Sequence, residues 1–304
     1  MPPLMLTSIP AILAVAATIP QTAAQEANAP SGQGDVVTVD ADGHSRYTVA
    51  VRIGESGPLR FLIDTGAERT VVSRSVADRL NLVPAGRATL VGIAGSIGVD
   101  LVEIDEVVLG RRSFYGLTAP VLERYDIGAD GIIGIDGLQD QRVLLDFGKG
   151  TMEVNDARSL GGDRGYEIIV RARRRSGQLI MTNALVDGIK TAVVIDTGAQ
   201  FSIGNRALQR ALAKRRQPER TSLSSVTGQS IPADLLMARE VEIGDLHMAN
   251  TWLAFADAPP FKSLDLDKQP ALLMGMNELR AFSRVAIDFD TRKVMFDLPA
   301  RQPG

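Results

Sequence analysis

Residues 61–73 read FLIDTGAERTVVS, and residues 193–204 read VVIDTGAQFSIG. Each stretch contains Ile-Asp-Thr-Gly-Ala, preceded by aliphatic residues and followed by a segment of Ser, Thr, Val and Ile. The two aspartates, Asp64 and Asp196, are 196 − 64 = 132 positions apart. A motif that recurs with similar neighbours indicates an internal repeat, and a repeat decides how the rest of the chain is interpreted.

Three further landmarks recur in the same order at a similar separation. They are Gly95 in VGIAGS and Gly228 in SVTGQS (228 − 95 = 133), Gly134 in DGIIGIDGL and Gly275 in ALLMGMNEL (275 − 134 = 141), and Asp146 in VLLDFGKGTMEV and Asp288 in VAIDFDTRKVMF (288 − 146 = 142). Any one match has a simple explanation, since glycine turns and Asp-Phe strands are common in β proteins. That explanation does not account for the ordered series, so we interpret the chain as two copies of one unit.

Each copy has the pattern of a β-rich domain. Residues 46–53 (RYTVAVRI) alternate as a half-buried strand does, and the apolar runs 59–63 and 191–195 end at the two Asp-Thr-Gly sequences. Residues 143–154 and 285–296 each predict a closing hairpin. The few helical stretches expected are 73–80, 205–213, 137–141 and 278–282. The predicted fold class is mostly β, with two pseudo-symmetric, barrel-like lobes and short helices.

The bulk composition narrows the class of protein. The chain has 304 residues, 45% hydrophobic content and a formal net charge of −3, a balance that does not suggest a nucleic-acid-binding protein. It contains no cysteine, which excludes disulfides, thiol catalysis and cysteine-bound metals.

The first 24 residues differ from the rest of the chain and predict a signal peptide. Leu4–Ile19 is apolar, and Thr22-Ala23-Ala24 resembles a cleavage site. No Lys or Arg precedes Arg46, so the basic n-region is missing, and a disordered or mis-started N-terminus is the alternative. A signal peptide implies a periplasmic or secreted protein. No later segment is apolar for long enough to span a bilayer.

The expected domain organisation follows from the repeat. We expect a signal peptide at 1–24, a linker at 25–45, a first lobe at 46–156, an inter-lobe linker at 157–164, a second lobe at 165–298 and a tail at 299–304. The inter-lobe linker contains Gly161-Gly162 and mixed charge, which is typical of a boundary between lobes.

The repeated motif predicts a pair of carboxyl groups. Burial of an aspartate after an apolar strand is costly, the glycine of the motif allows a sharp turn, and the threonine hydroxyl can bond across to the other copy. If pseudo-symmetry brings the two turns together, the carboxyl groups share one proton, because both cannot ionise cheaply. The ionised member could then take a proton from water, and the protonated member could hydrogen-bond a substrate carbonyl.

Together these residues resemble a known family. The chain is similar to the retropepsin-like aspartic peptidases of the bacterial two-lobed kind, whose plan is that of pepsin and of the retroviral protease dimer, over roughly residues 46–298. The resemblance implies a bilobal acid protease fold and an aspartic endopeptidase with catalytic Asp64 and Asp196. It also implies a peptide or protein substrate, no cofactor and a monomer, because both half-sites lie in one chain. The matching positions around the aspartates are the loop residues Thr65, Gly66, Ala67, Thr197, Gly198 and Ala199, and the supporting residues Ile132, Ile133, Gly134, Leu273, Met274 and Gly275.

The family covers its cleft with a flap, which is the tip of a β-hairpin. The best candidate is the segment 92–98, GIAGSIG, with 226–229 as its counterpart in the second copy. An ordinary glycine-rich hairpin is the alternative, and the segment lacks the flap tyrosine of pepsin. The individual flap candidates are Gly92, Ile93, Ala94, Gly95, Ser96, Thr227 and Gly228.

Other interpretations of the same residues remain open. Asp64 and Asp196 could form two Asx-type turns, or the fold could serve a non-catalytic peptide-binding or scaffold protein, although the duplicated motifs with both aspartates present favour catalysis. His44 and His247 lack the spacing of a zinc site, so no metal is expected. Trp252 is expected to pack in the second lobe, with a position in the substrate cleft as the alternative. The run Arg171 to Arg175 could bind an anion but is more typical of a solvated hairpin end.

Overall fold

A computed structural model describes residues 47–110, 112–139, 141–155, 162–212 and 218–299, together with the backbone of short strands at 9–10, 35–38 and 40–41. His44, the rest of the expected signal peptide and linker, and most of the expected inter-lobe linker lie outside these residues.

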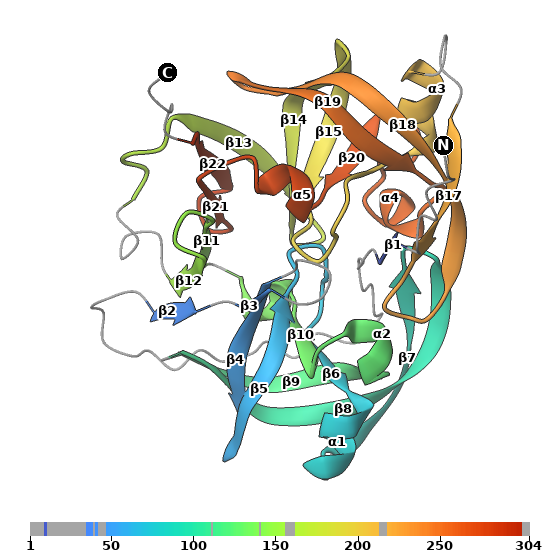
Figure 1. The fold of residues 1–304 in the computed structure, drawn as a ribbon. Coiled ribbons are helices and arrows are strands. Elements are labelled where there is room, and N and C mark those ends of the chain that lie inside the picture. Colours follow the sequence, from blue (N-terminus) through green and yellow to red (C-terminus); the bar gives the residue numbers. More distant parts are fainter. Residues whose placement is uncertain are drawn as a thin grey trace, which may run out of the picture.

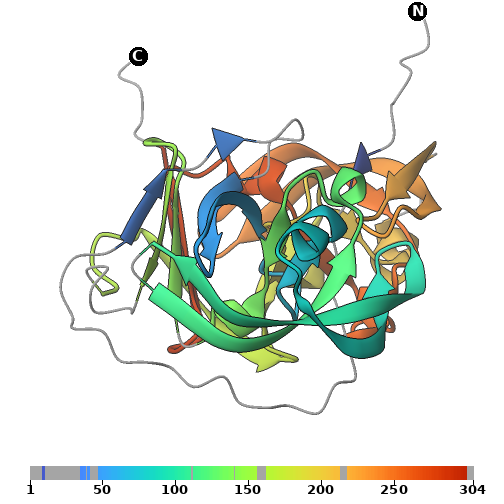
Figure 2. The same ribbon diagram turned by 90° about the horizontal axis from the view of Figure 1, so that it is seen from below.

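The first lobe is built on an eight-stranded sheet in the order β3-β4-β5-β10-β6-β9-β8-β7. Its strands are β3 (Asp40–Ala41), β4 (Tyr47–Ile53), β5 (Ser56–Ile63), β6 (Val71–Ser73), β7 (Val83–Gly92), β8 (Gly95–Leu109), β9 (Arg112–Leu122) and β10 (Gly131–Ile133), and its helices are α1 (Arg74–Arg79), α2 (Arg124–Ile127) and the 3₁₀ turn η1 (Ile135–Gly137). The long strands β8 and β9 run across the lower side of the molecule (Figure 1, Figure 2).

The second sheet has fourteen strands in the order β1-β17-β18-β19-β16-β20-β15-β14-β13-β22-β21-β11-β12-β2. The strands are β1 (Ile9–Pro10), β2 (Asp35–Thr38), β11 (Arg142–Asp146), β12 (Thr151–Asn155), β13 (Ile168–Arg175), β14 (Gln178–Val186), β15 (Ile189–Ile195), β16 (Ile203–Gly204), β17 (Glu219–Ser224), β18 (Ser230–Ile243), β19 (Leu246–Phe255), β20 (Ala271–Met274), β21 (Arg284–Asp288) and β22 (Lys293–Asp297). The helices are α3 (Arg206–Leu212), α4 (Pro259–Ser263) and α5 (Met276–Leu279). The expected mostly β, bilobal fold is therefore confirmed.

The two predicted closing hairpins join the lobes. Hairpin β11–β12 lies in the range expected for the first lobe, 46–156, yet β11 pairs antiparallel with β21 of the second hairpin, with Arg142 opposite Asp288. Both hairpins lie to one side of the lobes in Figure 1. Because backbone hydrogen bonds cross from one hairpin to the other, the sheet fixes the lobes relative to each other.

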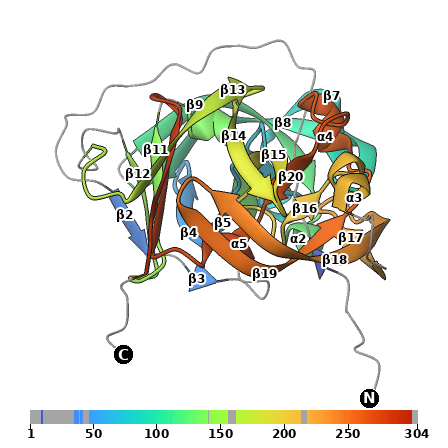
Figure 3. The same cartoon turned by 90° about the horizontal axis from the view of Figure 1, so that it is seen from above.

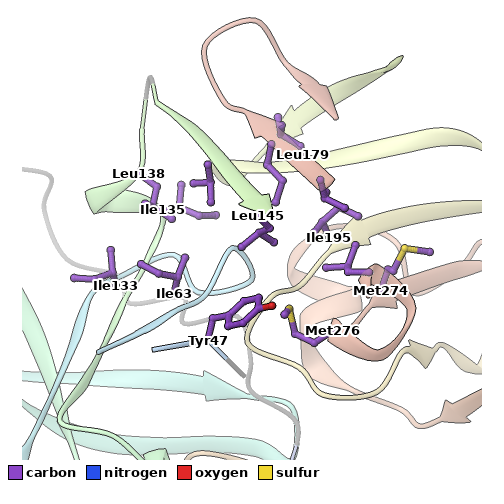
Figure 4. Packing of buried hydrophobic residues seen from close by; sticks show 14 of the residues in the cluster. Tyr47, Ile63, Ile133, Ile135, Leu138, Leu145, Leu179, Ile195, Met274 and Met276 are labelled. Carbon is purple, nitrogen blue, oxygen red and sulfur yellow. The ribbon is translucent and has the colours of Figure 1, made fainter. Parts of the chain in front are cut away.

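One apolar core runs through both halves of the molecule. Figure 4 shows Ile63 and Ile133 of the first lobe, Ile195 and Met274 of the second, and Leu145 of β11 between them. All five are at most 3% exposed. The four lobe residues directly precede the Asp-Thr-Gly turns or belong to the supporting motifs, so the same packing that stabilises the core also holds both turns in place.

The short helices after the supporting motifs begin earlier than predicted. The sequence predicts helices at 137–141 and 278–282, whereas η1 covers Ile135–Gly137 and α5 covers Met276–Leu279. Each begins directly after a glycine, Gly134 or Gly275, whose extended backbone ends the preceding strand. The sequence pattern thus identified the elements and missed their boundaries.

Candidate active site

The two Asp-Thr-Gly turns are placed by the same strand pairing in each lobe. Strand β5 leads to Asp64 and lies parallel to β10, while β15 leads to Asp196 and lies parallel to β20. The Asp64 amide donates to the Ile133 carbonyl at 3.0 Å, and the Asp196 amide donates to the Met274 carbonyl at 2.9 Å. Each aspartate is thereby fixed to the supporting segment of its own lobe.

The threonines of the two turns hold each other across the lobe boundary. The Thr65 hydroxyl donates to the Ile195 carbonyl at 2.8 Å and accepts from the Thr197 amide at 3.2 Å. Reciprocally, the Thr197 hydroxyl donates to the Ile63 carbonyl at 2.8 Å and accepts from the Thr65 amide at 3.1 Å. Four buried hydrogen bonds therefore lock the turns together, and each hydroxyl is used both as donor and as acceptor.

The backbone after each aspartate orients its carboxylate. Asp64 Oδ1 accepts from the amides of Gly66 at 2.8 Å and Ala67 at 3.1 Å. In the second turn, Asp196 Oδ1 accepts from the amides of Gly198 and Ala199, both at 3.1 Å. Both carboxyl groups keep one oxygen on the turn, so their second oxygens can serve another partner.

The glycines of the turns allow the two carboxyl groups to meet. A Cβ atom at Gly66 would lie 2.8 Å from the Asp196 carboxyl carbon, and one at Gly198 would lie 2.3 Å from the Asp64 carboxyl carbon. Each turn therefore packs against the aspartate of the other lobe. Any side chain at either position would push the pair apart.

The pair is buried, and burial controls its protonation. Asp64 is 0% exposed and Asp196 is 1% exposed. Burial first, and then the neighbouring charge of Asp64, raise the pKa of the Asp196 carboxyl well above its usual value, although the amides of Ala199 and Gly198 act in the opposite direction. A hydrogen bond between the two carboxyl groups also raises it. The pair thus holds a proton under conditions in which an exposed aspartate has lost it.

Behind the turns lies a second repeated layer that the sequence analysis missed. The Thr70 hydroxyl accepts from the Gly134 amide at 3.2 Å and donates to Asp136 at 2.8 Å. In the second lobe, the Ser202 hydroxyl accepts from the Gly275 amide at 3.0 Å and donates to Glu278. The separations, 202 − 70 = 132 and 278 − 136 = 142, match those of the larger repeat and could have revealed the layer.

The acids of this second layer are also buried. Burial raises the pKa of Asp136, against the lowering effect of its hydrogen bonds from Thr70 and Gly137. Burial likewise raises the pKa of Glu278, and this effect outweighs the hydrogen bond from the Ser202 hydroxyl, which acts to lower the pKa. Gly134 and Gly275 are needed here, because a Cβ atom would lie 2.4 Å from the Arg69 backbone or 2.7 Å from the Phe201 backbone.

A side chain of the second lobe bonds to the turn of the first lobe, and the described residues contain no equivalent contact in the opposite direction. The buried Gln178, at the start of β14, donates through Nε2 to the Gly66 carbonyl at 2.6 Å. By strand register, Ile180 lies opposite Val194 as Thr48 lies opposite Leu62. The position equivalent to Gln178 is therefore residue 46, which lies outside the described residues.

The two predicted flap segments meet in space. Gly92 and Gly95 close the β7–β8 hairpin around Ile93 and Ala94, and Ser96 is exposed on β8. A Cβ atom at Gly92 would lie 2.8 Å from the Ser225 hydroxyl.

The second hairpin, β17–β18, carries Thr227 and Gly228 in its turn. A Cβ atom at Gly92 would also lie 3.2 Å from the Thr227 methyl group. Ile93 and Val226 are at most 2% exposed and belong to one apolar cluster. The tips of the two hairpins thus pack against each other.

The structure also places Trp252 and His247, two residues that the sequence analysis considered singly. Trp252 was expected to pack in the second lobe, but it is 45% exposed on β19, so that prediction is wrong. His247, which lacks the sequence spacing of a zinc site, lies with its Nδ1 2.8 Å from a carboxylate oxygen of Glu240. With Glu242 it forms the one group of possible metal ligands within the described part of the chain. None of these three side chains belongs to the two Asp-Thr-Gly turns.

The sequence comparison gives the family of this two-lobed protein. The chain matches the family model for aspartyl proteases over residues 49–137 and 182–277, more than half of its length. It therefore belongs to the aspartyl protease family. A search of the curated proteins finds no match.

Proposed function

We propose that the protein is an aspartic endopeptidase that hydrolyses peptide bonds with Asp64 and Asp196 as its catalytic pair. The observation that carries the proposal is the buried contact of these carboxyl groups, each packed against the glycine of the other turn. Family membership supports the reaction class. The second repeated layer and the four threonine hydrogen bonds support a rigid site.

The proposed mechanism needs one proton on the pair. The ionised carboxylate takes a proton from a water molecule, while the protonated carboxyl donates to the carbonyl oxygen of the scissile bond. Attack by the water gives a tetrahedral intermediate without a covalent bond to the enzyme. The proton then passes to the leaving amine, and the amide hydrogen bonds at each Oδ1 keep the carboxyl groups in plane during both transfers.

The pH dependence follows from the same proton. Activity falls at low pH when both carboxyl groups are protonated, and falls at higher pH when the shared proton is lost. Because the pKa of Asp196 is raised, the loss on the alkaline side is expected well above the usual range of an aspartate. A pH–rate profile on a peptide library measures both limits, and a sharp optimum at pH 2 contradicts this expectation.

A non-catalytic peptide-binding or scaffold protein is the second candidate. It would keep the lobes, flaps and cleft, but it would not need two paired carboxyl groups. Burial of two aspartates against each other costs stability, so their presence favours catalysis over scaffolding alone.

The decisive experiment compares the wild type with Asp64→Asn and Asp196→Asn on a peptide library. We expect each variant to lose about 10²- to 10⁴-fold or more in turnover, the range typical of a general acid or base. Both should keep the fold, measured by circular dichroism and by the denaturation midpoint. Wild-type turnover in either variant contradicts the shared-proton mechanism.

We further propose that the protein acts as a monomer, because both half-sites lie in one chain, and that residues 1–24 direct it to the periplasm or outside the cell. In the described part of the chain, no helix is both long and apolar enough to cross a membrane. Sedimentation of the active preparation tests the first statement. N-terminal sequencing of the protein from cell fractions tests the second.

A further inference from the structure

A basic cavity of about 570 Å³ lies in the second lobe. Arg173, Arg174 and Arg175 of β13 and Lys190 of β15 contribute to its lining. Figure 3 shows β14, β15 and β20 next to one another at this part of the lobe. The arginine run was expected to be a solvated hairpin end. Its side chains are exposed, but they surround a hollow rather than a convex surface.

The cations of the cavity differ in whether they are already paired. Arg175 is held by the Leu264 carbonyl, to which its Nη1 donates at 3.0 Å, and by the Asp265 carboxylate. Arg173 and Lys190 have no ion-pair partner among the described residues. Arg175 thus fixes one wall, and two further cations are available for an anionic group.

The cavity adjoins strand β15, which leads to Asp196. Ile180 and Ala192 line the cavity and belong to the same apolar cluster as Ile93 and Val226 of the flaps. Ala192 lies 196 − 192 = 4 residues before Asp196 on a strand that ends at the catalytic turn, a distance of about 13 Å at the usual rise of a strand. An extended peptide spans this distance in about four residues.

We propose that this cavity is a subsite for an acidic side chain of the peptide substrate, about four residues from the bond that is cleaved. The proposal rests on the proposed function and adds a substrate class to it, namely peptides with Glu or Asp at that distance. A carboxylate suits the site because Arg173 and Lys190 offer charged donors, and the Thr182 side chain on the same lining adds a polar contact.

The test is a binding measurement that does not depend on turnover. The Asp64→Asn variant is titrated with fluorescent peptides that are identical except for Glu or Gln, with the acid placed at each position up to five residues from the centre. Fluorescence anisotropy should show the Glu peptide binding roughly three- to tenfold tighter at one position, as two partly exposed ion pairs allow. The preference should shrink at high salt.

Charge reversals in the same background locate the effect. Arg173→Glu and Lys190→Glu should each remove or invert the preference for Glu. Arg171→Glu is the matched control, because Arg171 is exposed on the same strand, lies outside the cavity and changes the net charge equally. The proposal is overturned if no position shows a preference for Glu, or if Arg171→Glu abolishes it as fully as the other two.

Two further arms separate the possible outcomes. If inorganic phosphate binds in a manner that depends on Arg173 while Glu and Gln peptides bind alike, the cavity is a small-anion site and the peptide proposal is wrong. If the wild type cleaves neutral peptides without any charge preference, the proposed function stands and the subsite fails. If the wild type cleaves none while the Glu preference persists, the proposed function fails and the acidic-peptide site stands.

Discussion

The two lobes have the same Asp-Thr-Gly turn but differ in what lies around it. Asp-Thr-Gly-Ala occurs in both, and the hydrogen bonds of the turns agree within a few tenths of an ångström. Behind the turns, the first lobe uses Thr70 with Asp136 and the second uses Ser202 with Glu278. The turns that carry the two carboxyl groups are therefore alike in both lobes, whereas the residues that support these turns from behind differ.

The two closing hairpins, β11–β12 and β21–β22, differ from each other more strongly than the supporting layers do. Arg142 and Arg284 are the first residues of β11 and β21, so they are equivalent by sequence. Arg142 is buried and forms an ion pair with Asp288 of the other hairpin at 2.6 Å, whereas Arg284 pairs with Asp297 on the neighbouring strand. Equivalent positions in a repeat therefore need not make equivalent contacts, because each lobe has different neighbours.

The largest effect on stability is expected from Arg142→Met. Asp288 is 0% exposed, so the substitution leaves a buried charge without its partner, at a cost of about 3–5 kcal/mol in the free energy of unfolding. Arg284→Met should cost about 1 kcal/mol or less, because Arg284 is partly exposed. Urea denaturation measures both. Equal costs would show that the two hairpins are energetically alike, and adding Asp288→Asn to Arg142→Met should restore part of the loss.

The next effect is expected at the glycines of the turns. Gly198→Ala brings a methyl group to 2.3 Å from the Asp64 carboxyl, closer than the 2.8 Å expected for Gly66→Ala. We expect about 1–3 kcal/mol of destabilisation and at least about a hundredfold loss of turnover for Gly198→Ala, with a smaller loss for Gly66→Ala. Kinetics on one peptide and thermal unfolding test this order. The reverse order would mean that the second turn yields more easily than the first.

At the threonines we expect effects of equal size in the two lobes. Thr65→Val and Thr197→Val each remove a hydroxyl that donates to one buried carbonyl and accepts from one buried amide, at about 1–3 kcal/mol. The serine substitution at either position is the control, since it keeps the hydroxyl. Unequal costs in chemical denaturation would reveal a difference between the lobes at a place where their contacts are the same.

The smallest effect is a change in the pH dependence of stability. Because burial raises the pKa of Glu278, the folded protein keeps this proton at pH values where the unfolded chain has lost it. Its contribution to stability is thus fully present below the usual pKa near 4.5 and is lost as pH rises through the folded pKa. Glu278→Gln stays neutral and can still accept from Ser202, so its stability should fall less between pH 4.5 and neutrality. Parallel pH curves for wild type and variant would contradict this.

Much of the fold and of the candidate site could be predicted from the sequence, for a specific reason. The chemistry of the turns depends on short contiguous motifs, so Asp64, Asp196 and their glycines are visible as a repeat. The alternation in strands and the closing hairpins are equally local. Trp252 was placed wrongly, because exposure depends on which other strands cover a sheet, and its own neighbours in sequence do not reveal that.

The sequence by itself determined the duplicated Asp-Thr-Gly motifs and the mostly β character, since each depends on residues close together along the chain. Only the tertiary structure decided that the two turns pack against each other, that Gln178 reaches the Gly66 carbonyl, that the tips of hairpins β7–β8 and β17–β18 are in contact, and that Arg173 and Lys190 share a cavity. These contacts join residues far apart in sequence. Their geometry depends on how the sheets pack and twist, which no local pattern specifies.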